Sequence, residues 1–270
     1  MPSSDRLASV PNDSLPGLTD THCHLDLPAF DVDRGEMMER ARRAGLVRIL
    51  IPGLDLSSSR RAADLAHSDP MLRFAPGVHP HESGGFTTRV LDELRILARA
   101  PGAVAIGEIG LDYYRNLAPR AQQQEAFRAQ LGLARELGLP AIVHIREAEE
   151  DALAILSAAG NGLRGVLHAF TGNPLLAERV PEMGFYFGIG GPITYPGSAR
   201  LREIFHALPR DRILLETDAP YLPPEGNRGK RNEPALVLAV ARKAAREWNQ
   251  DALELVQTAR RNANNLFAWE

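Results

Sequence analysis

The stretch Leu18-Thr-Asp-Thr-His-Cys-His-Leu-Asp26 decides between the two folds that the rest of the chain allows. It contains the first of eight short runs that we interpret as strands, each followed by a stretch with helical periodicity. Strands that alternate with helices pair in parallel, either in an open doubly wound sheet or in a closed barrel. An open sheet of the nucleotide-binding kind would carry a glycine-rich phosphate loop after its first strand, whereas the turn here reads His22-Cys-His-Leu-Asp26. The sequence therefore predicts an α/β fold of the closed (β/α)8 TIM-barrel type.

The predicted elements fill nearly the whole chain. The strands are expected at residues 18–24, 48–52, 73–78, 103–108, 140–145, 164–169, 185–190 and 212–218. The helices are expected at residues 33–44, 58–67, 90–100, 120–137, 148–158, 175–181, 199–207, 235–248 and 252–264. Eight such units in about 250 residues match the size of one barrel, so we expect a single domain over residues 18–270. Residues 1–17, rich in Ser, Pro, Asp and Gly, are expected to form a loose tail in front of it.

The composition excludes several classes of protein. The chain has 270 residues, is 44% hydrophobic and 24% charged, and carries a formal net charge of −3, which does not fit collagen-like, disordered, coiled-coil or membrane proteins. No run approaches the roughly 20 apolar residues needed to cross a bilayer. Asp5 and Arg6 interrupt the N-terminal segment where a signal peptide would be apolar. We therefore expect a cytoplasmic protein that needs no membrane, and no obligate protein partner is evident.

The charge and the single cysteine limit the chemistry. With only Cys23, no intramolecular disulfide and no all-cysteine zinc site can form. A net charge near zero gives no broad basic field of the kind that marks many nucleic-acid binders. It does not exclude an anionic substrate, because bound metal ions would supply a local positive charge.

Histidines gather where the predicted strands end. Six of the eight histidines in the chain lie at strand exits: His22, His24, His79, His81, His144 and His168. Active sites of (β/α)8 barrels lie at the carboxyl ends of the strands, because the βα loops converge there. Two acidic residues, Glu108 and Asp218, also end predicted strands. This coincidence is the strongest functional signal in the sequence.

The pair His22 and His24 points to a metal ion. Residues i and i+2 of a strand point to the same side, so both imidazoles can reach one ion at the barrel mouth, while Cys23 points toward the helix layer and packs there. Imidazole and carboxylate ligands together suit zinc, manganese or iron better than calcium, which prefers oxygen.

Six segments resemble the TatD-type metal-dependent hydrolases, a family of the wider amidohydrolase-like barrels, in the family's order and spacing from about Leu18 to Leu266. They are Thr19-Asp-Thr-His-Cys-His-Leu-Asp26, Gly77-Val-His-Pro-His81, Ala105-Ile-Gly-Glu-Ile-Gly-Leu-Asp-Tyr-Tyr114, His168-Ala-Phe-Thr-Gly172, Leu215-Glu-Thr-Asp-Ala-Pro-Tyr-Leu222 and Arg231-Asn-Glu-Pro234. The resemblance implies a TIM-type barrel that holds one or two divalent ions, such as Mg²⁺, Mn²⁺ or Zn²⁺. It also implies hydrolysis of phosphodiester bonds in DNA.

The resemblance further implies a ligand set. His22, His24 and Asp218 would bind one ion, and Glu108 would bridge to a second ion held by His144 and His168. The wider superfamily often uses a carbamylated lysine as the bridge, but the only lysines, Lys230 and Lys243, do not end predicted strands. A glutamate bridge is therefore the consistent choice.

We assign roles to further residues as hypotheses. Asp218 would accept a proton from the attacking water in addition to binding metal. His79 lies outside the ligand set and would contact the scissile phosphate or the leaving group, with a structural hydrogen bond as the alternative. Arg146, Arg228, Lys230 and Arg231 are candidates for holding phosphate oxygens, with a solvated loop as the alternative for the last three.

The predicted function is a metal-dependent deoxyribonuclease, and the resemblance suggests a 3′–5′ exonuclease acting on single-stranded or frayed DNA ends. A related barrel hydrolase acting on a lactone, a cyclic amide or an aminoacyl ester is the alternative, because the same activated water attacks a carbonyl equally well. A barrel that binds metal without turnover would be favoured by a missing ligand, and none is missing.

Overall fold

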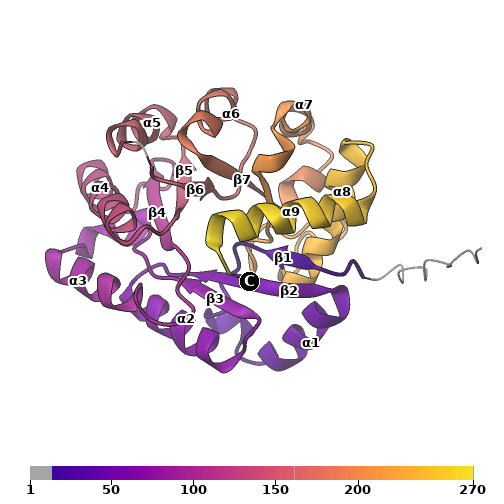
Figure 1. Ribbon diagram of the computed structural model, residues 1–270, viewed down its shortest axis with the longest axis horizontal. Helices are drawn as coiled ribbons and strands as arrows, with labels where there is room; N and C mark the ends of the chain where they lie inside the picture. Colours follow the sequence, from indigo (N-terminus) through magenta and orange to yellow (C-terminus); the bar gives the residue numbers. More distant parts are fainter. Residues whose placement is uncertain (1–13, 161, 270) are drawn as a thin grey trace, which may run out of the picture.

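Parallel strands alternate with helices along residues 14–160 and 162–269, which are the residues that this computed structural model describes (Figure 1). The predicted (β/α)8 barrel is confirmed. The strands are β1 (Leu18–Asp20), β2 (Leu46–Pro52), β3 (Leu72–Ala75), β4 (Ile106–Asp112), β5 (Ala141–Arg146), β6 (Gly165–Leu167), β7 (Phe185–Ile189) and β8 (Ile213–Leu215). The helices are α1 (Arg34–Ala44), α2 (Leu56–Ser68), α3 (Thr88–Leu97), α4 (Arg120–Leu137), α5 (Glu149–Ala158), α6 (Pro174–Arg179), α7 (Ala199–Ala207), α8 (Val237–Glu247) and α9 (Ala252–Phe267). Short 3₁₀ helices cover Pro28–Phe30, Pro80–Gly85, Pro181–Met183, Gly191–Thr194, Arg210–Arg212 and Pro234–Leu236.

The strands form a ring with two seams. β1 to β3 make one parallel sheet and β4 to β8 another, each in chain order. Backbone hydrogen bonds cross both seams: Val104 donates to the carbonyl of Phe74 (3.0 Å), and Thr21 donates to the carbonyl of Leu215 (3.0 Å). The eight strands therefore surround one interior although their ladders are not continuous.

The interior of the barrel is filled from its amino-terminal end. One side chain from each of several strands points inward, including Leu50, Ile142 and Leu214, and these pack against the end of α9. Figure 1 shows α9 crossing this end of the barrel. Trp269, almost fully buried, completes this interior cluster. Arg48 donates a hydrogen bond to the Trp269 carbonyl (3.1 Å). Because this end is packed shut, the opposite end is where a site can open.

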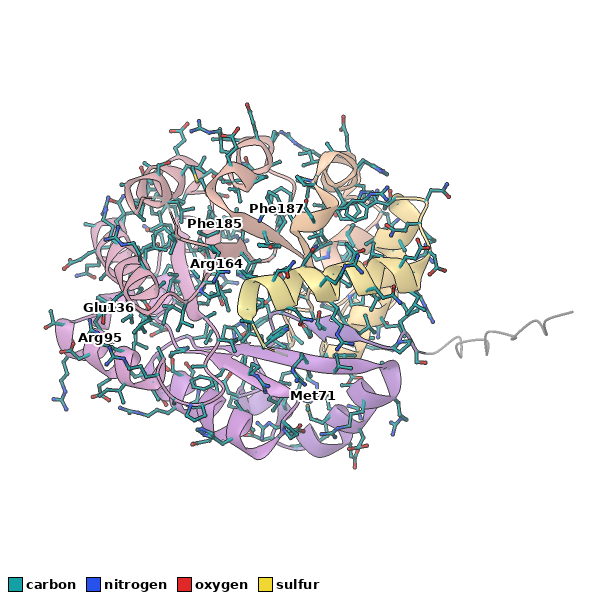
Figure 2. All side chains as sticks on the ribbon, viewed as in Figure 1. Met71, Arg95, Glu136, Arg164, Phe185 and Phe187 are labelled. Carbon is teal, nitrogen blue, oxygen red and sulfur yellow. The ribbon has the colours of Figure 1, made fainter. Side chains whose placement is uncertain are left out.

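The second core layer lies between the strands and the helices. On β7, Phe185 and Phe187 belong to this outer layer, whereas Tyr186 between them belongs to the interior (Figure 2). This alternation is the period-2 pattern of a strand buried on both faces. Figure 2 also shows Arg95 of α3 beside Glu136 of α4, whose charged groups lie 3.0 Å apart and join the two helices.

Some boundaries differ from the sequence-based expectation. The first strand, expected over residues 18–24, leaves its regular ladder after Asp20, because Cys23 donates its backbone hydrogen bond to Leu50 and pairs with Ala219 across the seam. The third helix begins at Thr88 instead of residue 90, because the Thr87 side chain accepts from the Val90 N–H (3.3 Å) and caps it.

The expected tail falls mostly outside the described residues. Residues 1–13 are not described. Leu15 is buried and donates a backbone hydrogen bond to Ala44 (2.9 Å), so the packed part of the chain includes residues before Leu18. No helix in the described ranges is long and apolar enough to cross a membrane, and the cytoplasmic location stays a prediction.

Candidate metal centre

The residues predicted as metal ligands meet at the carboxyl ends of the strands. His22 and His24 follow β1, Glu108 lies in β4, His144 lies in β5, His168 follows β6 and Asp218 follows β8. All of them except the fully buried His22 line one cavity of about 390 Å³ that opens to solvent.

A first group of ligand atoms surrounds one point. The Nε2 atoms of His22 and His24 lie 3.2 Å apart. Oε2 of Glu108 lies 3.3 Å from the first and 3.5 Å from the second, and Oδ1 of Asp218 lies 3.7 Å and 3.6 Å from them. Ligand atoms about 2.0–2.1 Å from a tetrahedral ion lie roughly 3.3–3.4 Å from one another. The spacing of this group therefore fits one divalent ion.

A second group faces the other oxygen of the same carboxylate. Oε1 of Glu108 lies 3.0 Å from Nδ1 of His144 and 2.8 Å from Nε2 of His168, and these two nitrogens are 3.0 Å apart. Glu108 thus presents Oε2 to one pair of histidines and Oε1 to another. Glu108 could therefore contribute one oxygen to each of two neighbouring groups of ligand atoms.

The chemistry of these side chains favours a bound cation. The buried carboxylate of Glu108 and the partly buried one of Asp218 face imidazole nitrogens, and the His22 and His24 Nε2 atoms can share at most one proton between them. Imidazole and carboxylate donors in such a set suit Zn²⁺, Mn²⁺ or Fe²⁺.

Electrostatics keeps the carboxylates ionised. Burial by itself would raise the pKa of Glu108, but the histidines around it, led by His168, outweigh burial and hold the pKa well below its usual range. Burial also lowers the pKa of His22 to about 4, with His168 adding to the effect, so this ring is neutral at pH 7 and offers a lone pair. Both states are those that a metal ligand needs.

Asp112 contacts His144 of the second group at the ring nitrogen that does not face Glu108. Its Oδ2 atom lies 3.2 Å from Nε2 of His144 and 2.9 Å from Nε2 of His81. Its Oδ1 atom accepts the backbone N–H of Arg115 (2.8 Å). Burial lowers the pKa of His144, but Asp112 and Glu108 outweigh it and raise the pKa to about 9. Asp112 therefore orients the ring whose Nδ1 faces Glu108.

His79 lies beside the second group, and its Nε2 atom could join Glu108 and His144 around an ion only in the other tautomer of the ring. Its Nε2 atom is 3.3 Å from Oε1 of Glu108, while its Nδ1 atom accepts the backbone N–H of His81 (3.1 Å). Burial lowers the pKa of His79 to about 4, so the ring is neutral at pH 7. A neutral imidazole that accepts at Nδ1 carries its proton on Nε2 and has no lone pair there for a metal. In this tautomer His79 is a hydrogen-bond donor at Nε2, which faces Oε1 of Glu108 at the wall of the cavity.

Two buried acids behind the centre were missed by the sequence reasoning. Asp20 accepts from the N–H and the hydroxyl of Thr217 (2.9 and 2.6 Å), and burial raises its pKa to about 7. Oε1 of Glu216 accepts the Ala169 N–H (2.5 Å), and burial raises its pKa well above the usual range. A Cβ on Gly188 would lie 2.0 Å from Oε2 of Glu216, so that glycine leaves room for the carboxyl. The signal was available, because both acids lie two residues before a ligand and share its side of the strand.

The predicted phosphate-binding residues are placed differently from one another. Arg146 lines the cavity, and its guanidinium lies 3.9 Å from the centre of the Tyr114 ring. Arg228 lies 4.9 Å from the Tyr195 ring, and neither it nor Lys230 belongs to the cavity lining. Arg231 binds Asp33 through two hydrogen bonds of 2.7 Å, which commits its guanidinium to α1.

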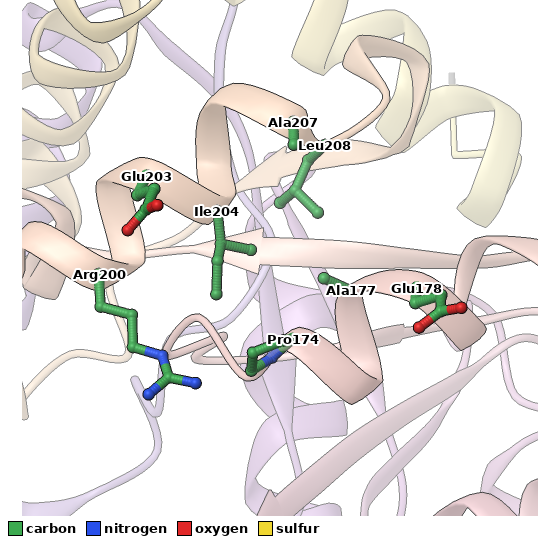
Figure 3. Close-up of a pocket in the computed structure, with 8 residues that line it drawn as sticks. All are labelled: Pro174, Ala177, Glu178, Arg200, Glu203, Ile204, Ala207 and Leu208. Carbon is green, nitrogen blue, oxygen red and sulfur yellow. The ribbon is translucent and has the colours of Figure 1, made fainter.

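A larger groove elsewhere holds no comparable chemistry. It measures about 800 Å³ and lies on the outside of the barrel between α6 and α7, where Figure 3 shows Ala177, Glu178, Arg200 and Ile204 along its walls. None of the groups of potential metal ligands found among the described residues lies there.

Comparison with known proteins agrees with this geometry. The family model of the TatD related DNases matches residues 19–268. A relative from Bacillus subtilis, the uncharacterised metal-dependent hydrolase YabD, is 38% identical over 93% of this chain and 98% of its own. The 3′-5′ ssDNA/RNA exonuclease TatD of Edwardsiella piscicida is 39% identical over 93% of this chain and 99% of its own. The crystal structure of YJJV, a TatD homologue from Escherichia coli K12, superposes with a TM-score of 0.88 at 33% identity over 93% of this chain and 98% of that one. The chain therefore belongs to the TatD related DNase family.

Proposed function

We propose that this protein is a divalent-metal-dependent nuclease that hydrolyses phosphodiester bonds in DNA. The observation that carries the proposal is Glu108, whose two oxygens face two separate groups of histidines at the floor of an open cavity. His22, His24 and Asp218 would hold one ion with Glu108, and His144 and His168 would hold the other. Divalent ions bound there would neutralise the phosphate charge and lower the pKa of a water.

The position and charge of Asp218 support a role for it as the acceptor of a proton during the attack. It lines the cavity, and its carboxylate is ionised, because His24, His22 and His168 lower its pKa more than burial raises it. A carboxylate that borders both the ligand group and the cavity is within reach of a water attacking the phosphorus atom.

The position of His79 in the cavity lining supports a role in substrate contact. A proton on its Nε2 atom would stabilise an oxygen of the scissile phosphate or protonate the leaving oxygen. The backbone hydrogen bond that Nδ1 accepts from His81 fixes the orientation of the ring and therefore of its Nε2 atom.

The finer activity follows from the relatives. Several of them, at 35% to 39% identity, carry the name 3′-5′ ssDNA/RNA exonuclease. We therefore propose a 3′–5′ exonuclease that acts on single strands or frayed ends. Arg146 is the one predicted phosphate contact that the cavity presents to such a strand.

The test is a cleavage assay with strands of known end label. Single-stranded and duplex DNA, labelled at the 5′ or the 3′ end, would be incubated with the protein and Mg²⁺, Mn²⁺ or Zn²⁺. A ladder that shortens from the 3′ end of single strands only is expected. A lack of DNA cleavage with every metal, together with hydrolysis of a lactone or ester, would replace the proposal with the carbonyl-directed alternative.

A further inference from the structure

Exposed apolar side chains lie on two loops that border the cavity, and two of them, Leu117 and Tyr221, line it. Seven large apolar side chains are well exposed in the described parts of the chain, and four of them lie on the loops that follow β4 and β8: Tyr114, Leu117, Tyr221 and Leu222. Both loops contribute to the cavity lining. Exposed aromatic rings beside a cleft mark a surface that meets a partner or a ligand.

Tyr221 stands on a fixed backbone beside the metal centre. Its N–H donates to the carbonyl of Asp218 (2.8 Å), and its carbonyl accepts from the side chain of the fully buried Asn232 (2.6 Å). Its ring lies 6.1 Å from the ring of His24, yet 53% of the residue is exposed. The result is a flat apolar surface that is held in place next to the ligands.

Two arginines supply positive charge at the mouth of the same cavity. Arg115 and Arg146 both line the cavity, and neither forms an ion pair with a carboxylate in residues 14–160 and 162–269. Arg115 lines the same cavity as Tyr221. Arg146 lies against the exposed ring of Tyr114.

We propose that this mouth is a subsite for an unpaired nucleotide, in which Tyr221 stacks on a base and Arg115 and Arg146 hold the phosphates beside it. The inference rests on the proposed nuclease function and assigns its selectivity for single strands to three residues. Aromatic rings beside cationic side chains are how proteins bind single strands without reading sequence, because every base has a face that can stack. Arginine adds paired hydrogen bonds to phosphate oxygens.

The test separates the base from the backbone. Octathymidylate would be compared with an octamer of the same sugar-phosphate backbone that carries no bases, using the metal-loaded protein and steady-state kinetics. For the wild type, KM for the base-free strand is expected to be about tenfold higher, the effect of one stacked base. Tyr221→Ala should raise KM for octathymidylate about tenfold, leave KM for the base-free strand unchanged and leave kcat unchanged. Tyr221→Phe, which keeps the ring, should behave as the wild type.

Substitution of the arginines is expected to change KM in a different way. Arg115→Ala and Arg146→Ala should raise KM for both strands alike and reduce the slope of log KM against log salt by roughly 0.7 for each lost phosphate contact. Ile96→Ala and Arg89→Ala, both exposed on α3, are the matched controls and should change nothing.

The outcomes distinguish the subsite from the nuclease function. Equal KM values of the wild type for both strands, or an equal effect of Tyr221→Ala on both, would overturn the subsite and leave the nuclease intact. If the wild type cleaves neither strand with any metal, the nuclease proposal fails. Fluorescence anisotropy with hydrolysis-resistant phosphorothioate versions of both strands then decides the subsite. The same pattern in Kd supports it, and equal Kd values overturn it.

Discussion

Asp112 holds His144 from the edge of the ring that faces away from the metal centre: its Oδ2 atom lies 3.2 Å from Nε2, while Nδ1 points at Glu108. A carboxylate in this position fixes the orientation of a ligating histidine and makes it more basic. A second ion held by His144 would therefore depend on a residue that does not touch it.

Replacing Asp112 by Asn keeps the shape and removes the charge. We expect the affinity of one of the two ion-binding steps to fall roughly 10–100-fold, while the other is unchanged. Calorimetric titration of metal-free protein with Mn²⁺ or Zn²⁺ measures both steps. Asp151→Asn is the control, because that carboxylate accepts from Tyr113 and lies away from the ligands. Two unchanged steps would show that Asp112 has no part in metal binding.

Glu108 is the residue on which both groups depend. Glu108→Gln replaces one oxygen by an amide nitrogen, which has no lone pair for a metal, so whichever way the amide turns one group loses a ligand. The bound metal measured by mass spectrometry after dialysis should fall by at least one equivalent, and DNA cleavage should fall more than about 100-fold. Retention of the full metal content by this variant would contradict a bridging role.

His79 should affect turnover without affecting metal. Because its Nε2 atom carries a proton, His79→Ala is expected to lower kcat roughly 10²–10⁴-fold, the usual range for a proton donor, at unchanged metal content. His67→Ala, on the outer face of α2, is the matched control. A fall in metal content for His79→Ala would identify His79 as a ligand instead.

Arg231 should contribute to stability and not to substrate binding. Its hydrogen bonds, together with those of Arg40, lower the pKa of Asp33 below its ordinary value of 3.8. A group with a lowered pKa stabilises the fold above its unfolded pKa, and this contribution is lost as the pH falls below it. Arg231→Ala and Asp33→Asn should therefore lower Tm by a few degrees at pH 7, less at pH 3, with no change in KM for DNA. A raised KM with unchanged Tm would restore the phosphate role predicted from the sequence.

The sequence predicted the order of elements, and the gathering of histidines and acids at strand ends, for physical reasons that are local. Alternating strands and helices fix the barrel, and the barrel fixes where strand ends point, so His22, Glu108 and Asp218 were expected at the same end of it. The assignment of these residues to particular ions came from the resemblance to the TatD-type hydrolases. The six predicted ligands do meet, with distances of 2.8–3.7 Å between neighbouring donor atoms.

The rest depends on contacts between segments far apart in the chain. The hydrogen bond from Arg231 to Asp33 joins positions 198 residues apart, and the local sequence around either residue does not predict it. The proximity of Tyr221 to Arg115 likewise arises only when the loops after β8 and β4 border one cavity. Asp112, by contrast, lies four residues after Glu108 on the same strand. Because side chains an even number of residues apart share a face of a strand, the sequence could have predicted that Asp112 points to the same side as Glu108.

The most direct test of the central claim is the nuclease activity of metal-free protein as divalent metal is added back. No cleavage of single-stranded DNA is expected in EDTA, and activity should rise until two equivalents of metal are bound. The His22→Ala/His24→Ala variant should show no recovery at the same metal concentration. Cleavage that persists in EDTA, or that the double variant retains in full, would rule out a metal-dependent nuclease at this site.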